Sequence, residues 1–242
     1  MSKRTSPYER ELDGILASLP KQAEAAAADR QPGSSCFSGS THLPCGDHSP
    51  ALPKPSLLLH ACCGPCSSYV LEYLSSRFEI TVLFYNPNIY PASEYERRLE
   101  ELKRFYTKFV PAQNVQVIED PYDPEEFYTA VGTRENPELA KEGERGERCR
   151  RCYELRLRRT YEYACAHNFD YFCTTLSISP FKDAGMINEI GTALQSGVPE
   201  PVEGPKWLPS DFKKKNGFKR SLELSAEYDL YRQEYCGCVY SM

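Results

Sequence analysis

The 242-residue sequence lacks several features that would place it in a common class of protein. No apolar run approaches the roughly 20 residues that span a bilayer, and the polar opening from Met1 to Ser6 has no apolar signal core. These absences predict a cytoplasmic protein without a membrane segment. The net charge of −5 excludes a uniformly basic surface, so any nucleic-acid contact must depend on local patches.

Cysteine, in contrast, is abundant, with 11 residues in the chain. The number is odd and the spacing is uneven, which argues against the disulfide framework of a small secreted protein. In a reducing compartment, clustered cysteines more often bind metal or carry redox chemistry. Three clusters stand out, namely Cys62, Cys63 and Cys66, then Cys149 and Cys152, and finally Cys236 and Cys238.

Residues 1–55 differ in composition from the rest and predict an N-terminal extension. An amphipathic stretch from Tyr8 to Leu19 predicts a short helix. The Gly-, Ser- and Pro-rich run from Gln31 to Pro55 cannot bury much apolar surface and predicts a flexible linker. Cys36 and Cys45 lie in this run, and we interpret them as isolated exposed thiols.

Residues 56–242 predict one α/β domain in which strands alternate with helices. The expected strands are 57–60, 80–85, 115–118, 170–175 and 206–208. The expected helices are one capped by Ser67, followed by 93–109, 124–131, 149–167, 183–196 and 220–228, with a loop at 132–147. This alternation predicts a mostly parallel, Rossmann-like sheet of the HUP type with helices on both faces. In such sheets ligands bind beyond the carboxyl ends of the strands.

The first cysteine cluster follows the first expected strand as Cys62-Cys63-Gly64-Pro65-Cys66. Adjacent residues of a regular strand point to opposite faces, but Gly64-Pro65 indicates a loop, in which both sulfurs can approach one metal. The sulfurs would also lie near the start of the next helix, whose positive dipole end stabilises thiolates. This cluster therefore predicts a metal or redox site in preference to simple core packing.

The other two clusters have spacings that suit different chemistry. Cys149 and Cys152 are three apart on an expected helix and share one face, and nearby arginines lower thiol pKa values. Zinc, iron–sulfur and dithiol sites all use this spacing. Cys236 and Cys238 are within disulfide range, but the small ring would be strained and easily reduced. That property suits a working dithiol better than a structural crosslink.

Three further residues are expected to be structural. His60 ends the first strand, Cys165 lies in an Ala-flanked helical stretch and Cys173 lies within an aromatic strand. We interpret the histidine as hydrogen-bonded and both cysteines as core residues.

Two basic patches also flank the cysteine clusters. They are the seven arginines between 145 and 159, and the group formed by Lys213, Lys214, Lys215, Lys219 and Arg220.

Six stretches, in order from Leu57 to Ser241, resemble motifs of the QueH-type epoxyqueuosine reductases. They are LLLHACCGPCSSY at 57–69, FYNPNIYP at 84–91, CRRCYELRL at 149–157, TTLSISP at 174–180, SDFKKK at 210–215 and YRQEYCGC at 231–238. The resemblance implies a cobalamin-independent oxidoreductase that completes queuosine biosynthesis by reducing the epoxide of epoxyqueuosine in tRNA. Residues 1–55 lie outside the resemblance.

The resemblance also implies the cofactors. It implies a 4Fe–4S cluster whose four ligands are Cys62, Cys63, Cys149 and Cys152. It further implies a redox-active pair formed by Cys236 and Cys238. An adjacent mononuclear iron is associated with the family, and Cys66 could serve that iron or tune the cluster. Because one cluster usually passes one electron at a time, a dithiol would supply a two-electron store, refilled by an unidentified donor.

A base in an anticodon loop is unpaired, so aromatic stacking and phosphate contacts suffice to bind it. The expected phosphate contacts are Lys213, Lys214, Lys215 and Arg220. The stacking candidates are Tyr85, Tyr90, Tyr153 and Tyr235.

Two alternative functions stay open, a zinc-stabilised RNA-binding module without catalysis and an ATP-dependent tRNA-modifying enzyme. The second usually needs a Gly/Ser-rich phosphate loop after the first strand, where this chain has cysteines and a proline.

Overall fold

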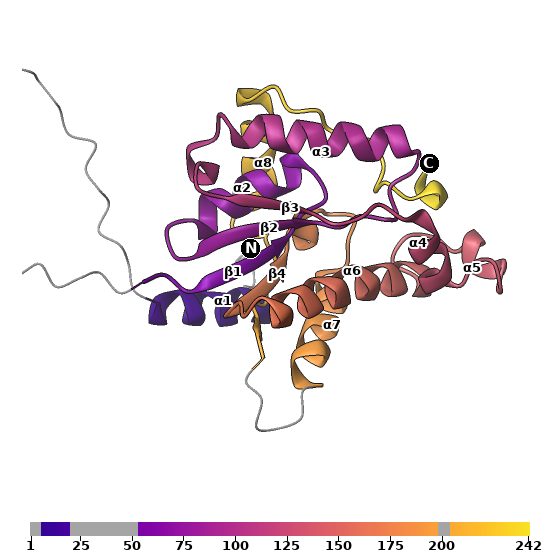
Figure 1. Cartoon of the computed structure of the whole chain (residues 1–242), viewed down its shortest axis with the longest axis horizontal. Coiled ribbons are helices and arrows are strands. Elements are labelled where there is room, and N and C mark those ends of the chain that lie inside the picture. Colours follow the sequence, from indigo (N-terminus) through magenta and orange to yellow (C-terminus); the bar gives the residue numbers. More distant parts are fainter. Residues whose placement is uncertain (1–5, 20–52, 198–203) are drawn as a thin grey trace, which may run out of the picture.

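The computed structural model describes residues 6–19, 53–197 and 204–242 (Figure 1). Its centre is a five-stranded sheet with the order β3-β2-β1-β4-β5. The strands are β1 (Ser56–His60), β2 (Glu79–Phe84), β3 (Gln116–Glu119), β4 (Tyr171–Thr174) and β5 (Lys206–Trp207). All four pairings are parallel, so the predicted α/β class is confirmed. Most of the predicted linker, with Cys36 and Cys45, lies outside the described residues.

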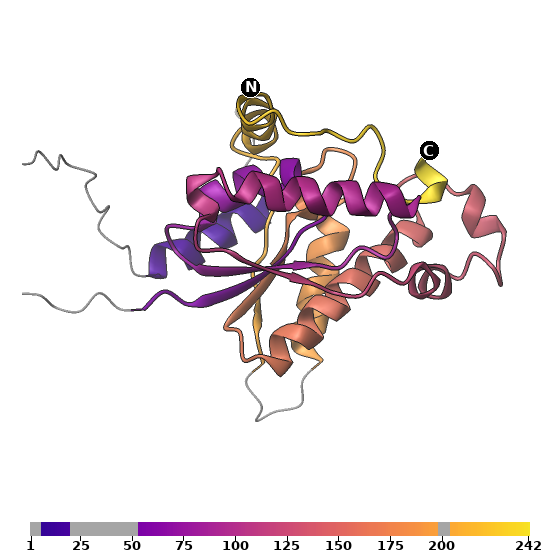
Figure 2. The ribbon, with the colours of Figure 1, turned by 45° about the horizontal axis from the view of Figure 1, so that its top comes forward.

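Helices cover both faces of the sheet (Figures 1 and 2). One face carries α2 (Gly64–Leu74), α3 (Ala92–Tyr106) and α8 (Gly217–Glu227), and the other carries α6 (Glu147–Ala166) and α7 (Ala184–Ser196). Before α6 come α4 (Pro124–Val131) and α5 (Glu138–Lys141), so the predicted loop at 132–147 contains one short helix. Short 3-10 turns are η1 (Val110–Ala112), η2 (Thr175–Ile178) and η3 (Val239–Ser241). Within the described ranges, no helix is long and apolar enough to cross a bilayer.

Strand β1 shows how the sequence sets the two faces. Leu57 and Leu59 belong to the core beneath α2 and α3, whereas Leu58 belongs to the core beneath α6 and α7. Successive strand residues point to opposite sides, and all three leucines are fully buried. An uninterrupted apolar run is therefore what a strand covered on both faces requires.

Helix α2 begins one turn earlier than predicted. Cys63 is its N-cap residue, and the Cys66 backbone N–H donates to Cys63 Sγ at 3.4 Å. Pro65 occupies the first turn, where its missing N–H costs nothing. The predicted cap, Ser67, instead donates its hydroxyl to the Gly64 carbonyl within the helix. The prediction was wrong because a thiolate or thiol replaces the usual hydroxyl or carboxylate acceptor at the cap.

The N-terminal stretch contains α1 (Pro7–Ser18), as its amphipathic pattern predicted. A capping box closes its start, because the Glu9 N–H donates to the Ser6 hydroxyl while the Ser6 N–H donates to the Glu9 carboxylate. Leu12 and Leu16 are buried in the core shared with α2 and α3. Helix α1 is therefore packed into the α/β core, although it lies within the stretch predicted to be an extension.

We expect Leu12→Ala and Leu16→Ala each to lower the free energy of unfolding by about 2–5 kcal/mol, because each leaves a cavity in a packed core. The matched control is Glu11→Ala on the exposed face of α1, expected to change stability by less than about 0.5 kcal/mol. Urea denaturation of the full chain measures both. Leucine variants as stable as the control would show that α1 contributes nothing to the fold.

Candidate active site

The cysteine-bearing segments meet beyond the carboxyl ends of β1 and β4. These strands are neighbours, yet the chain leaves β1 toward β2 on one side and returns to β4 on the other. Such a reversal of strand order is where open α/β sheets bind ligands. The first cluster follows β1, and the segment from Ser179 to Lys182 follows β4 and η2. The fold thus places the first predicted cluster at the expected edge.

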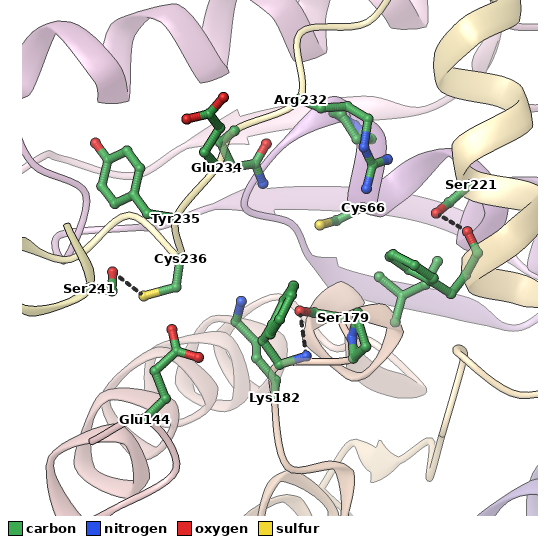
Figure 3. A pocket seen from close by; sticks show the side chains of 16 residues that line it. Cys66, Glu144, Ser179, Lys182, Ser221, Arg232, Glu234, Tyr235, Cys236 and Ser241 are labelled. Atoms are coloured by element: carbon green, nitrogen blue, oxygen red, sulfur yellow. Dashed lines mark hydrogen bonds between the residues drawn. The ribbon is translucent and has the colours of Figure 1, made fainter. Parts of the chain in front are cut away.

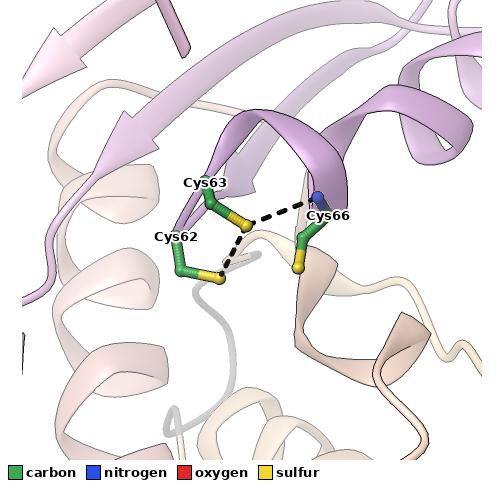
Figure 4. Close-up of side chains that lie close together, drawn as sticks. All are labelled: Cys62, Cys63 and Cys66. Atoms are coloured by element: carbon green, nitrogen blue, oxygen red, sulfur yellow. Dashed lines mark hydrogen bonds between the residues drawn. The ribbon is translucent and has the colours of Figure 1, made fainter. Parts of the chain in front are cut away.

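Cys62, Cys63 and Cys66 form the tightest group of sulfurs. Their Sγ atoms lie within 4.8 Å of one another and turn toward a common point (Figure 4). Cys62 and Cys63 are buried and hydrogen-bonded at an Sγ–Sγ distance of 3.9 Å, and the Gln233 side-chain amide donates to Cys63 Sγ at 3.0 Å. Three soft donors at this spacing can hold a metal ion.

The electrostatics of this group are uneven. Hydrogen bonds from Cys63 and Cys66 hold the pKa of the Cys62 thiol well below its usual range, and Lys182 and Arg156 act in the same direction. Burial raises the pKa of the Cys63 thiol to about 12. Cys62 is therefore the thiol of this group that loses its proton most readily, and metal binding requires all three thiols to be deprotonated.

Two cavities that share part of their lining connect the three clusters. The larger, about 270 Å³, has Cys66 and Cys236 in its walls (Figure 3). The smaller, about 20 Å³, is lined by Cys149, Cys152, Cys236 and Cys238. The residues common to both linings are Glu144, Phe181, Lys182 and Cys236. All three predicted clusters therefore reach one connected region.

Cys149 and Cys152 lie between the other two clusters. Cys149 packs against the buried group that contains Cys62 and Cys63, whereas Cys152 packs in a separate group with Cys238. Neither sulfur belongs to the group in which all Sγ distances are within 4.8 Å. The closest set of thiols thus includes Cys66, which sequence reasoning left as an extra residue.

Cys236 and Cys238 form an asymmetric dithiol. Their Sγ atoms are 3.5 Å apart, and all described cysteines are free thiols. The hydrogen bond with Cys238 holds the pKa of the Cys236 thiol well below its usual range, and Lys182 and Ser241 add to the effect. Cys238 is buried, whereas Cys236 faces both cavities. Cys236 is therefore the more accessible sulfur of the pair and the one that is deprotonated more readily.

Sequence reasoning missed Lys182, whose side chain reaches into the space between Cys66 and Cys236 (Figure 3). Burial acts to lower the pKa of its ammonium group, but the sulfurs of Cys62, Cys236 and Cys66 outweigh burial and raise that pKa. The available signal was its position just after η2, at the carboxyl edge of the sheet. Sequence reasoning also missed Glu144 and Phe181, which line both cavities.

The arginine-rich stretch is not one solvated surface. Arg156 is buried and donates to the Cys152 carbonyl at 3.3 Å, and Arg148 is buried and donates to the carbonyls of Leu139 and Ala140. Other members pair with carboxylates on or near α6, namely Arg151 with Glu147, Arg158 with Glu154 and Arg159 with Asp120. Arg148 and Arg156 are therefore part of the interior, and Arg145 donates to the carbonyls of Pro180 and Phe181 in the wall of the larger cavity.

The lysine patch is also engaged with carboxylates. Lys213 pairs with Asp211 at 2.6 Å and Arg220 pairs with Glu72 at 2.7 Å. Lys215 pairs with Asp13 of α1. Phosphate groups of a nucleic acid would therefore have to compete with these carboxylates.

The four tyrosines proposed for stacking differ in exposure. Tyr85 and Tyr153 are buried, so they are core residues and not free platforms. Tyr90 is 46% exposed, and Tyr235 is partly exposed and lines the larger cavity. Phe181 is 65% exposed and lines both cavities. The best-placed aromatic rings are therefore Phe181 and Tyr235.

The structural expectations for three residues had mixed outcomes. His60 is fully buried, its ring bonds to Thr174 Oγ1 at 2.8 Å and the Tyr85 carbonyl at 3.1 Å, and burial lowers its pKa to about 4. Cys173 is fully buried and bonds to the Leu208 carbonyl, so both predictions are confirmed. The prediction for Cys165 was wrong, because neighbouring Ala164 takes the buried position on α6 and Cys165 is exposed.

A parallel α/β sheet thus brings three cysteine groups and several cations together at its switch point, an arrangement suited to metal or redox chemistry. The family model of epoxyqueuosine reductase QueH matches residues 57–242. The chain therefore belongs to the epoxyqueuosine reductase QueH family, and it is an oxidoreductase. The resemblance found in the sequence motifs is confirmed.

Curated relatives agree with this assignment. A protein named epoxyqueuosine reductase QueH from Streptococcus pyogenes serotype M1 is 45% identical over 191 residues, which cover 78% of this chain and 71% of the relative. Its namesake from Staphylococcus aureus strain Mu50 is 42% identical over 190 residues, covering 78% and 76%. The Thermotoga maritima namesake is 36% identical over 193 residues, covering 77% and 90%. Helix α1 precedes the region that the family model matches.

Proposed function

We propose that the protein reduces the epoxide of epoxyqueuosine in tRNA to the cyclopentene of queuosine. This proposal rests on one observation: a metal-capable cysteine group and a dithiol both line the same cavity. Cys66 of the metal-capable group and Cys236 of the dithiol both line it, with Lys182 beside them. A family of epoxyqueuosine reductases supplies the substrate class.

The dithiol can meet the demands of this reaction. Converting an epoxide to an alkene breaks two C–O bonds, consumes two electrons and two protons and releases the oxygen as water. Oxidation of Cys236 and Cys238 to a disulfide forms one S–S bond and releases two electrons and two protons. The two electrons and two protons that the epoxide consumes are thus the ones that the dithiol releases, so a single turnover needs no other reactant. An external two-electron reductant must then restore the dithiol.

The thiol donor set fits an iron–sulfur cofactor. In our proposal a 4Fe–4S cluster is held by Cys62, Cys63, Cys149 and Cys152. Cys66 is then available to an adjacent iron, because its sulfur lies in the tight group and also faces the larger cavity. When bound, iron supplies a Lewis acid for the epoxide oxygen and a path for single electrons.

Lys182 and Cys236 are the residues of this chain that we assign to the reacting region. The Lys182 ammonium lies in the lining of both cavities and favours the thiolate of Cys236. It also holds a proton at Nζ beside the space where the oxygen would leave. A thiolate and a proton donor are thus kept in one partly enclosed volume, as general acid catalysis requires.

We propose that tRNA binds through two separate contributions. An unpaired base can stack on Phe181 at the mouth of the cavities, and Tyr235 lies in the same lining. The phosphate backbone would follow the basic patch of Lys213, Lys214, Lys215 and Arg220. Asp13 and Glu72 are partly exposed, so phosphates can compete with them for Lys215 and Arg220 at low salt, whereas Asp211, the partner of Lys213, is buried.

We expect these two contributions to be separable by their salt dependence. Phe181→Ala removes stacking worth about 1–3 kcal/mol and should weaken tRNA binding about 5- to 150-fold at every salt concentration. Replacing Lys213, Lys214 and Lys215 with alanine should weaken binding mainly at low salt. It should also reduce the slope of log K against log salt by about 0.7–0.9 for each lost phosphate contact. Filter binding across a salt series measures both, and an unchanged slope would show that the patch does not meet phosphate.

The proposed function is tested by converting tRNA that carries epoxyqueuosine with anaerobically prepared protein and a chemical reductant. Nucleoside digestion and mass spectrometry should show queuosine formed and epoxyqueuosine lost. Colourless protein that contains zinc, binds tRNA and converts nothing would support the RNA-binding alternative. Conversion that requires ATP would support the ATP-dependent alternative.

A further inference from the structure

The turn that carries the dithiol is held from behind by a buried arginine on α3. Arg98 is 1% exposed, and its Nε donates to Glu94 Oε1 at 2.6 Å, one helical turn away. Its terminal nitrogens face the main chain of the redox segment, where Nη1 donates to the Cys236 carbonyl at 3.3 Å and Nη2 to the Tyr235 carbonyl at 3.5 Å. A charge buried this deeply requires such partners. The guanidinium group and the turn are therefore fixed together.

Other contacts hold the same turn against Arg98. Gly237 has φ +116°, and a Cβ there would lie 2.9 Å from Arg98 Nη1 and 3.1 Å from Ile89 Cγ1. The Tyr90 N–H donates to the Gly237 carbonyl at 2.8 Å, and the Tyr235 hydroxyl donates to the Tyr90 carbonyl. Only glycine combines this backbone conformation with so close an approach. The turn is thus enclosed between α3 and the loop that follows β2.

The residues just before the turn extend this attachment. The Tyr231 hydroxyl donates to both carboxylate oxygens of Glu94, at 3.2 and 3.1 Å, so the partner of Arg98 is itself held. Gln233 donates to Cys63 Sγ at 3.0 Å. The segment therefore connects the α3 ion pair with the metal-capable group. Arg98 lines neither of the two cavities described above, so it does not touch a substrate bound there.

We propose that Arg98 is a positioning residue that directs the Cys236 and Cys238 side chains toward the cavity by holding the carbonyls of Tyr235 and Cys236. The expected effect of Arg98 on the reaction rate rests on the proposed function, in which the dithiol stores two electrons. Its expected effect on the geometry of the turn does not depend on that function. A lysine keeps the positive charge opposite Glu94 but has one nitrogen and lacks the planar fork of donors. Arg98→Lys should therefore release the turn without leaving Glu94 unpaired.

The direct readout is the equilibrium between dithiol and disulfide. Full-length protein is prepared anaerobically, equilibrated in glutathione buffers of known ratio, quenched and alkylated. Trypsin cleaves after Arg232 and releases Gln233–Met242, which contains only the cysteines 236 and 238. Mass spectrometry of that peptide gives the oxidised fraction. We expect Arg98→Lys to change the equilibrium constant at least about tenfold, or about 30 mV for this two-electron couple. We also expect kcat to fall at least about tenfold while KM for tRNA is unchanged.

The matched control is Arg97→Lys, the same substitution on the adjacent residue. Arg97 is exposed, and its guanidinium carbon lies 3.4 Å from the centre of the Tyr231 ring. We expect this variant to keep the wild-type equilibrium and kcat. A wild-type dithiol equilibrium in Arg98→Lys would overturn the proposal. A shifted equilibrium with wild-type kcat would support the positioning role and count against the electron-store role of the dithiol.

A second variant keeps the proposal testable if Arg98→Lys does not fold. Glu94→Gln leaves the Arg98 fork in place but removes the charge that anchors it. We expect a smaller shift of the dithiol equilibrium in the same direction, because the guanidinium is held less firmly. No shift in a folded Glu94→Gln protein would overturn the proposal.

Discussion

Replacing Cys236 with serine is expected to abolish turnover while leaving tRNA binding intact. The Cys236 sulfur faces both cavities and lies 3.5 Å from Cys238 Sγ. The variant therefore loses the more accessible thiol of the Cys236/Cys238 dithiol. Serine keeps the size of the side chain but cannot form a disulfide. Because the two electrons would then have no store, we expect kcat to fall by about 10³-fold or more. Anaerobic turnover and filter binding of tRNA measure the two properties separately.

The control for this prediction is Cys165→Ser, which changes an exposed thiol on the far part of α6. It should retain activity and tRNA affinity, since Cys165 lines neither the 270 Å³ cavity nor the 20 Å³ cavity. Cys238→Ser should be as inactive as Cys236→Ser, because both sulfurs are needed for the disulfide. Full single-turnover and steady-state activity in Cys236→Ser would remove the dithiol from the mechanism.

The sequence was sufficient to predict the sheet and one edge of the site. The leucine run from Leu57 to Leu59 suits a buried strand that runs into a loop, and the cysteines after it were expected at the carboxyl end of that strand. The helical spacing of Cys149 and Cys152 also survived in the structure, on α6. These features depend on neighbours in the sequence, which is why local patterns predicted them.

The remaining parts of the site depend on contacts between distant residues. Arg98 meets the Cys236 carbonyl across 138 positions of the chain, and Lys215 meets Asp13 across 202. No period or spacing encodes such pairs, because they follow from how whole helices pack. The same reason explains why Lys182 looked ordinary in the sequence. Its significance comes from the sulfurs that surround it after folding.

Buried and partly buried cations are a consistent feature of this centre. Arg156 and Lys182 each lie near cysteines of more than one cluster, and Arg98 lies near Cys62 and Cys63 and donates to the Cys236 carbonyl. Burying positive charge without a partner is costly, so these side chains need anions close by. Thiolates, free or bound to metal, supply that negative charge. Arg98 already has the Glu94 carboxylate as its partner, so this argument applies to Arg156 and Lys182, and it favours thiolates over neutral thiols in their surroundings.

Metal analysis of cysteine variants is expected to decide which thiols hold the cofactor. Anaerobic wild-type protein should contain about four sulfides and at least about four irons per chain and should absorb broadly in the visible range. Cys63→Ser and Cys149→Ser should each lose most of the sulfide and colour, because each removes one of four proposed ligands on two different elements. Cys66→Ser should keep the sulfide and lose at most the additional iron, since its sulfur is not among those four.

The cysteine variants can distinguish two arrangements of the cofactor, because the group of sulfurs within 4.8 Å and the proposed ligand set contain different cysteines. Cys62 and Cys63 belong to both, Cys66 belongs only to the group within 4.8 Å, and Cys149 only to the proposed ligand set. Loss of sulfide in Cys66→Ser together with its retention in Cys149→Ser would place the cofactor on the tight group alone. Zinc without sulfide in the wild-type protein would contradict both arrangements. Cys165→Ser should match the wild type in every measurement, because an exposed thiol on α6 has no part in either set.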